Sequence, residues 1–208
     1  MGTKPTTAVA FFNPNRDNGY LYQASLDIQR QFGNNLMLDI GYLGTFGHKL
    51  PAPDAQSIDQ VPTNLLGAGN TQDLRPFPQF SNVQIIAADI GASKYDGLNI
   101  GIDKRYSNGL LFKANYTYSK FMDNTDSRNE LAAYPGTDSF TNYYNQANDW
   151  GLSGNDIRHR FVFSTVYELP VGRNRQFKIN NRALDLVVGG WSIGTILELR
   201  TGTPLRCV

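Results

Sequence analysis

The residues best suited to chemistry lie in the short segment 155–160, which reads Asn-Asp-Ile-Arg-His-Arg. Its carboxylate, imidazole and guanidinium groups could act as acids and bases or bind a metal. However, the only other histidine is His48 and the only cysteine is Cys207, so a metal site would require distant loops to meet. No nucleophile elbow, phosphate-binding loop or paired-carboxylate motif is present. We therefore expect no catalysis, metal or cofactor, and a structural ion-pair or hydrogen-bonding role at the outer rim for Asp156, Arg158, His159 and Arg160.

The composition restricts the partners of the chain. Among 208 residues, 19 Lys and Arg face 18 Asp and Glu, which gives a net charge of +1. Such a balance creates no field that would attract nucleic acid. Charged residues make up 18% of the chain, below the roughly 25% that is usual for soluble domains, whereas Tyr and Phe are abundant. We expect part of the surface to face something other than water.

The elements that must position these groups are strands, because hydrophobic residues recur with a period of 2. In the clearest example, Leu110, Phe112 and Ala114 alternate with Lys113 and Asn115. The pattern predicts strands near residues 20–32, 35–46, 81–106, 109–121, 157–169 and 189–201. The third is interpreted as one strand bent near Gly91, with a small extracellular hairpin as the alternative, and 170–188 as an irregular basic connector.

The length of these strands favours a membrane. A tilted strand needs roughly 9 to 11 residues to cross the hydrocarbon, whereas strands of soluble sandwiches usually have about 5 or 6. Short turns alternate with two long polar loops, near 47–80 and 122–156, as in transmembrane barrels. The predicted fold is all-β, an antiparallel transmembrane β-barrel segment of residues 1–208. About six strands cannot enclose an aqueous lumen, so further strands are expected from the same polypeptide or from partner chains.

Aromatic residues on the apolar faces are expected to form girdles at the two membrane interfaces. With short turns on the periplasmic side, the outer girdle would contain Tyr20, Tyr22, Tyr42, Phe46, Tyr116, Tyr118 and Phe121. The inner girdle would contain Phe32, Tyr106, Tyr167 and Trp191.

Two sets of residues are candidates for contact with a solute. Polar side chains opposite the apolar faces would line the lumen: Asp103, Arg105, Lys113, Asn115, Glu168, Glu198 and Arg200. Aromatic side chains of the second long loop could stack on a sugar or peptide: Tyr134, Tyr143, Tyr144 and Trp150. Each set also has a plain structural interpretation, since lumen charges can simply be solvated or contact a plug, and loop aromatics can pack loops together.

Several motifs occur in a consistent order through most of the chain. They are Arg-Pro-Phe-Pro-Gln-Phe at 75–80, Ser-Lys-Tyr-Asp-Gly-Leu at 93–98, Lys-Arg-Tyr-Ser-Asn-Gly-Leu at 104–110 and Ala-Asn-Tyr-Thr-Tyr-Ser-Lys at 114–120. Later come Asn-Asp-Ile-Arg-His-Arg-Phe at 155–161, Glu-Leu-Pro-Val-Gly at 168–172, Gly-Gly-Trp at 189–191 and Thr-Gly-Thr-Pro-Leu at 201–205. Together they resemble the barrel region of Oar-like TonB-dependent outer-membrane transporters.

This resemblance implies a barrel of about 22 strands around an internal plug, which imports scarce or bulky solutes with energy passed on by TonB. The partners would be outer-membrane lipid, the rest of the barrel, the plug and a solute. TonB would be reached only through segments that this sequence lacks, as it also lacks a plug and an N-terminal domain. The implied location is a Gram-negative outer membrane.

Two alternatives remain open at the level of sequence. A secreted or surface β-sandwich could bind carbohydrate through its loop aromatics, and would be a water-soluble monomer. A passive, porin-like barrel would share the membrane wall but not the coupling to TonB. The isolated chain is expected to aggregate or to require detergent, because its sheet would expose an apolar face and two edges.

Overall fold

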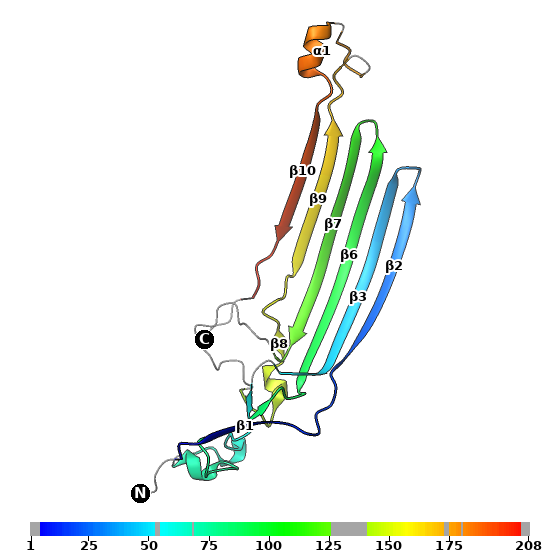
Figure 1. Cartoon of the computed structure of the whole chain (residues 1–208). Coiled ribbons are helices and arrows are strands. Elements are labelled where there is room, and N and C mark those ends of the chain that lie inside the picture. The colour runs from blue at the N-terminus through cyan, green and yellow to red at the C-terminus, as the bar shows by residue number, and fades with distance from the viewer. Residues whose placement is uncertain are drawn as a thin grey trace.

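The computed structural model describes residues 5–52, 55–67, 69–125, 141–172, 175–179 and 181–204. Its main element is a single curved antiparallel sheet of long strands (Figure 1). The strand order is β10-β9-β7-β6-β3-β2, and the two-residue β8 (Gly151–Leu152) pairs with the end of β7. The strands are β2 (Tyr20–Phe32), β3 (Leu36–Leu50), β6 (Gly91–Ser107), β7 (Leu110–Asp123), β9 (His159–Glu168) and β10 (Ser192–Arg200).

At one end of the sheet, here called the turn end, tight turns join β2 to β3 and β6 to β7, and a connection that contains a short helix joins β9 to β10. Asn108 and Gly109 connect β6 to β7 with φ of 51° and 78°, the left-handed backbone that a two-residue hairpin of the twist-matched type needs. Gly33, with φ of 61°, turns β2 into β3. The long connections lie at the opposite end, here called the loop end (Figure 1). The sheet thus has the alternation of short and long connections that the sequence predicted.

The register gives the sheet two different faces. One row across all six strands consists of Ile28, Ile40, Ile100, Tyr116, Phe161 and Leu199. The neighbouring row on the other side consists of Gln29, Asp39, Gly101, Asn115, Val162 and Glu198. Because side chains alternate along every strand, these rows define an apolar face and a polar face that extend over the whole sheet.

Neither face of the sheet is covered within the described residues. Every residue of β2 and β10 is exposed, and Leu26 and Ile28 retain 65% and 64% of their accessible surface. The buried hydrophobic residues are Ala52, Val83, Ile85 and Ala88, all outside the main sheet. An apolar face of this extent is stable only against lipid or another apolar surface. In the described residues the long strands form a single layer, whereas the sandwich alternative needs a second sheet packed on the first.

A second, small sheet lies beyond the loop end (Figure 1). Here β5 (Asn82–Ile86) pairs in parallel with β1 (Ala8–Phe12) and antiparallel with β4 (Gln56–Ser57). The 3-10 helices η1 (Thr63–Leu65), η2 (Thr71–Leu74) and η3 (Gln146–Asp149) complete this region, which we call the cap. Ala52, Ile85 and Ala88 form its core, and Ile58, Ile90 and Tyr143 pack around them.

The predicted strand 81–106 is wrong as a single element, and so is the local hairpin that was its alternative. The chain is interrupted between β5 and β6, where Ala87 adopts a left-handed φ of 51°. Val83 and Ile85 are then buried in the cap, whereas β6 enters the main sheet. The physical reason is that β5 finds a partner far away in the sequence, β1, and not in its own neighbourhood.

The predicted irregular connector before β10 contains a short helix, α1 (Arg182–Val188). Asn181 caps it, because its Oδ1 accepts a hydrogen bond of 2.9 Å from the Ala183 backbone N–H. With seven residues, α1 is too short for sequence periodicity to identify. Across the described ranges, no helix has the length and apolar character needed to span a membrane.

Candidate functional site

The polar face brings some of the predicted lumen residues together and separates others. Asp103 pairs with Lys113 across β6 and β7, and Asn115 is opposite Gly101. With Met37, Asp39 and Ile102 they line a depression of about 70 Å³. Asp39 was not predicted as a lumen residue, although it lies on the polar face of β3, and its Oδ1 is buried without a hydrogen-bond partner. This group offers a carboxylate pair, one cation and one amide to a polar solute.

A larger depression of about 310 Å³ lies on the same face, between β2 and β7. Ser25, Asp27, Tyr95, Asn99 and Thr117 contribute to its lining. The Thr117 hydroxyl donates a hydrogen bond of 3.2 Å to Asn99 Oδ1. The polar groups of this depression are hydroxyls, one amide and one carboxylate, which suit hydrogen bonding to a hydroxylated solute, and Leu43 adds an apolar side chain.

Glycines create the space for both depressions. A Cβ at Gly41 would lie 2.1 Å from Asp27 Oδ1, and a Cβ at Gly97 would lie 2.7 Å from the Tyr95 hydroxyl oxygen. At Gly101 the same atom would lie 2.7 Å from Asn115 Oδ1. The side chains of Asp27, Tyr95 and Asn115 therefore lie directly over the backbone of these glycines, and any larger residue at the glycine positions would displace them.

The remaining predicted lumen residues lie apart from these depressions. Glu198 Oε1 accepts a hydrogen bond of 3.0 Å from Arg160 Nε, and Arg200 is the register partner of Arg160. Arg105 lies where the β6–β7 register shifts near the turn end. Its backbone N–H donates to the Asn35 carbonyl over 2.8 Å.

Glu168 belongs to a cluster at the turn end of β9. Its Oε2 accepts hydrogen bonds from the Tyr106 hydroxyl at 2.7 Å and from Arg175 Nη2 at 2.6 Å. Hydrogen bonding with Tyr106, and then with Glu168, raises the pKa of Arg175 above its ordinary value. Arg175 is therefore a permanent cation, and it ties the connector before α1 to the ends of β6 and β9.

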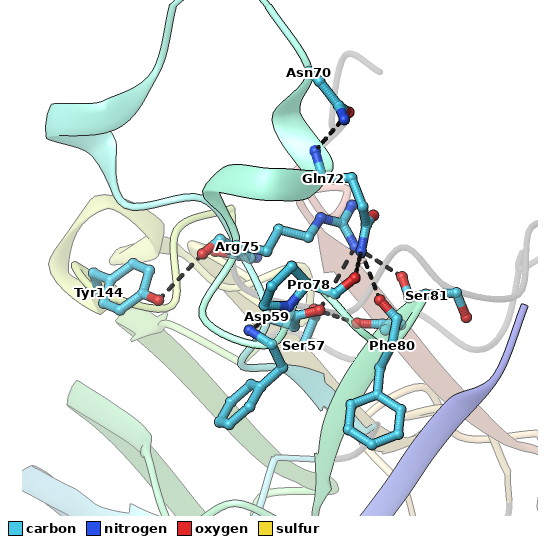
Figure 2. A network of polar contacts seen from close by, with 12 residues as sticks. Ser57, Asp59, Asn70, Gln72, Arg75, Pro78, Phe80, Ser81 and Tyr144 are labelled. Atoms are coloured by element: carbon cyan, nitrogen blue, oxygen red, sulfur yellow. Dashed lines mark hydrogen bonds and ion pairs between the residues drawn. The ribbon is translucent and has the colours of Figure 1, made fainter. Parts of the chain in front are cut away.

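The cap is organised by a buried carboxylate (Figure 2). The Asp59 side chain is fully buried, and its Oδ1 accepts a hydrogen bond of 2.9 Å from the Phe77 N–H. Its Oδ2 lies 3.8 Å from Arg75 Nη1, which also donates to the Ser81 carbonyl over 2.7 Å. Thus the motif 75–80, one of those that carry the family resemblance, folds as a turn around Asp59.

A glutamine fixes the closing part of the same turn. Gln72 Nε2 donates to the Pro78 carbonyl over 2.9 Å and to the Phe80 carbonyl over 2.7 Å (Figure 2). Gln72 is itself held by Asn70, whose Oδ1 accepts from the Gln72 N–H. The turn is therefore built from side chain to backbone hydrogen bonds, which need no hydrophobic core.

The loop aromatics that were proposed to contact a ligand serve first to join the two long loops. Tyr143 packs against the cap core, and its N–H donates to Gln60 Oε1 over 2.8 Å. The Tyr144 hydroxyl donates to the Gln60 carbonyl over 3.1 Å, while 48% of Tyr144 remains exposed. Trp150 is also partly exposed. Tyr134 lies outside the described residues, so among the predicted loop aromatics the exposed rings are those of Tyr144 and Trp150.

The segment 155–160 has the predicted structural role. Asp156 is 2% exposed, its Oδ1 accepts a hydrogen bond of 2.6 Å from the Phe121 N–H, and its Oδ2 lies 3.4 Å from Arg158 Nη2. The Ser119 N–H donates to the Arg158 carbonyl. These contacts fix the returning loop to the end of β7. In the part of the chain described by the structure, no cluster of His, Cys, Asp and Glu could hold a metal.

The apolar face carries aromatic rings at the loop end, together with both histidines. His48 lies 5.4 Å from Tyr20 between ring centroids, and His159 stacks on Tyr116 at 6.1 Å. Phe121 was predicted among these rings, and this is wrong. It pairs with Tyr95 on the polar face, with ring centroids 6.3 Å apart, because β7 keeps a regular alternation up to its end and odd-numbered positions stay on that side.

Comparison with known proteins agrees with this architecture. No curated protein and no solved structure matches the chain. A protein family described as "Outer membrane beta barrel domain" matches residues 1–208. The long antiparallel strands, the apolar face that none of the described residues covers and the polar face behind it are the features that such a domain requires. The chain therefore belongs to the outer membrane β-barrel domain family.

Proposed function

We propose that the chain forms part of the wall of a TonB-dependent transporter in a Gram-negative outer membrane. The observation that carries the proposal is the polar face, which extends over all six strands of a sheet whose edge strands β2 and β10 are not neighbours. An outer-membrane barrel needs at least eight strands, so other strands must complete it. A lumen lined by such polar rows is wide and wet, as uptake of a bulky polar solute requires.

Specific features favour an energised transporter over a passive pore. The ordered series of motifs resembles the Oar-like TonB-dependent family, and one of them, 75–80, organises the cap. Tyr144 and Trp150 offer exposed rings there for a first contact with solute. Asp39, Asp103, Lys113 and Asn115 would then meet the solute within the lumen. The plug, TonB and the solute are partners in this proposal, and the chain itself has no enzymatic role.

The experiment compares growth on a panel of sole carbon, nitrogen and iron sources. Three strains are used: wild type, a deletion of this gene, and a strain without functional TonB. We expect the deletion strain to lose growth on a subset of sources, all of which the TonB-deficient strain also loses. If the deletion strain fails on a source that the TonB-deficient strain still uses, and the purified full protein makes vesicles swell in sugar solutions, the protein is a passive porin.

A pair of variants tests the lumen assignment. Lys113 lies on the polar face, whereas Lys104 belongs to the apolar face, in register with Leu36 and Phe112. Lys113→Met removes the cation from the depression, so we expect a several-fold change in the uptake rate of the solute that the growth experiment identifies. Lys104→Met removes the same charge from the opposite face and should leave uptake near the wild-type rate. Equal effects of the two substitutions would contradict the assignment of the faces.

A further inference from the structure

The connection between β9 and β10 exposes a concentrated group of apolar side chains. It differs from the other connections at the turn end, which are tight turns, because it contains α1 (Figure 1). The exposed fractions are 55% for Leu184, 81% for Leu186, 68% for Val187, 44% for Val188 and 60% for Trp191. Nothing in the described residues covers this surface.

The apolar residues of α1 share one side of the helix. Successive residues in a helix are rotated by about 100°, so Ala183, Leu184, Leu186, Val187 and Val188 occupy one broad arc. Arg182 and Asp185 occupy the remaining arc. Asp185 is only partly exposed. The helix is therefore amphipathic, with a polar side that is narrower than its apolar side.

Trp191 connects α1 to the apolar face of the sheet. Residues 191 and 193 alternate with Ser192, and Ile193 pairs with Tyr167 on the apolar face. The indole Nε1 of Trp191 donates a hydrogen bond of 2.8 Å to the Val187 carbonyl. The last turn of α1 is thus attached on the side of the sheet that faces lipid, and its apolar surface continues that face beyond the turn end.

The charges around α1 identify the kind of partner that fits. Lys178 and Arg182 are exposed, and Arg175 is held nearby through Glu168. Cations next to an apolar surface at the end of a membrane-spanning sheet match the phosphate groups of phospholipids. A tryptophan that exposes its ring beside other apolar side chains and has its N–H hydrogen-bonded, as Trp191 does, is also typical of a membrane interface.

We propose that α1 and Trp191 form an anchor that inserts into the boundary between phospholipid headgroups and acyl chains at the turn end of the barrel. Leu184, Leu186 and Val187 enter the acyl region, while Arg182 and Lys178 contact phosphates. The anchor fixes the depth of β9 and β10 in the bilayer. This inference depends on family membership but not on transport, because it involves neither TonB nor a solute.

The test places a fluorescent label on each side of the helix. In the purified full protein with Cys207→Ser, either Leu184→Cys or the matched control Arg182→Cys, which lies on the opposite side of the helix, is labelled with an environment-sensitive dye. Each protein is reconstituted in vesicles of phosphatidylethanolamine and phosphatidylglycerol, and circular dichroism checks that the β-structure is retained. Quenching by brominated lipids is then compared with quenching by aqueous iodide.

We expect the label at position 184 to emit at shorter wavelength and to be quenched several-fold more by brominated lipid than the label at position 182. The label at position 182 should be the one that iodide reaches. Equal accessibility of both labels to iodide in a correctly folded protein overturns the proposal and would indicate a protein partner for α1. A failure of the TonB experiment would leave this result unaffected, so the two proposals fail separately.

Discussion

Replacement of Asp59 should loosen the cap without affecting the main sheet. Asp59→Ala leaves the Phe77 N–H without its acceptor at 2.9 Å and removes the carboxylate that Arg75 faces. A hydrogen bond to a charged group contributes about 1.5–3 kcal/mol. The ion pair adds little, because Arg75 is 3.8 Å away, partly exposed and bonded to Ser81. We therefore expect the opening of the cap to become easier by about 2–3 kcal/mol.

The assay is hydrogen exchange followed by mass spectrometry on peptides that cover residues 56–81. A change of about 2–3 kcal/mol in local opening corresponds to roughly 30- to 150-fold faster exchange. Asp59→Asn keeps an oxygen that can accept from Phe77, so its effect should be about 1 kcal/mol. Asp73→Ala is the matched control, since Asp73 is bonded at the surface of the same loop, and it should change stability by less than about 0.5 kcal/mol.

Two results would refute this reasoning. Unchanged exchange at 56–81 in Asp59→Ala would mean that the buried carboxylate does not organise the turn. Equal acceleration of exchange in β6 and β7 would mean that the cap and the sheet unfold as one unit. In that case the cap would not be the separate structure that its own core of Ala52, Ile85 and Ala88 implies.

Two further predictions concern the turns and the loops. Gly109→Ala should lower the melting temperature of the detergent-solubilised protein more than Gly33→Ala. Both glycines have positive φ, which costs an L-residue about 1–2 kcal/mol. Only a Cβ at Gly109 would meet a neighbouring atom, the Glu168 carbonyl oxygen at 3.1 Å. Equal melting temperatures would show that this contact relaxes at no cost. Gln60→Ala removes the acceptor of the Tyr143 N–H and should make limited proteolysis within 141–152 several-fold faster. The control Gln79→Ala should leave that rate unchanged. Equal rates in the two variants would contradict the role of Gln60 in joining the loops.

The sequence predicts strands and their two faces well where one face of the strand is apolar and the other is polar. In β7 the contrast between Phe112 and Lys113 repeats along the strand, so alternation alone identifies both the strand and its faces. The predicted bounds 20–32 coincide with β2, and 109–121 lies close to β7 (Leu110–Asp123). Asp103, Lys113 and Asn115 were assigned to the polar face by the same alternation, and they line one depression.

Elements that depend on distant partners could not be predicted. The five residues of β1 acquire their role from β5, which no local pattern reveals. The apolar run 186–188 is too short to distinguish a helix from a strand, and the capping contact of Asn181 is the main local signal for α1. Phe121 is different, because the odd-numbered series of β7 already placed it on the polar face.

The parallel pairing of β1 with β5 also constrains the order in which the protein assembles. The whole β2–β3 hairpin lies between these two strands in the sequence, and the loop that carries Tyr143 follows later still. The β1–β5 pair therefore needs the β2–β3 hairpin to return the chain to the same side of the membrane, and the Tyr143 loop can join the cap only after β6 and β7 have returned it as well. After the cap has formed, it opposes movement of the strands back across the membrane, because such movement would first have to expose the buried side chains of Asp59 and Gln56.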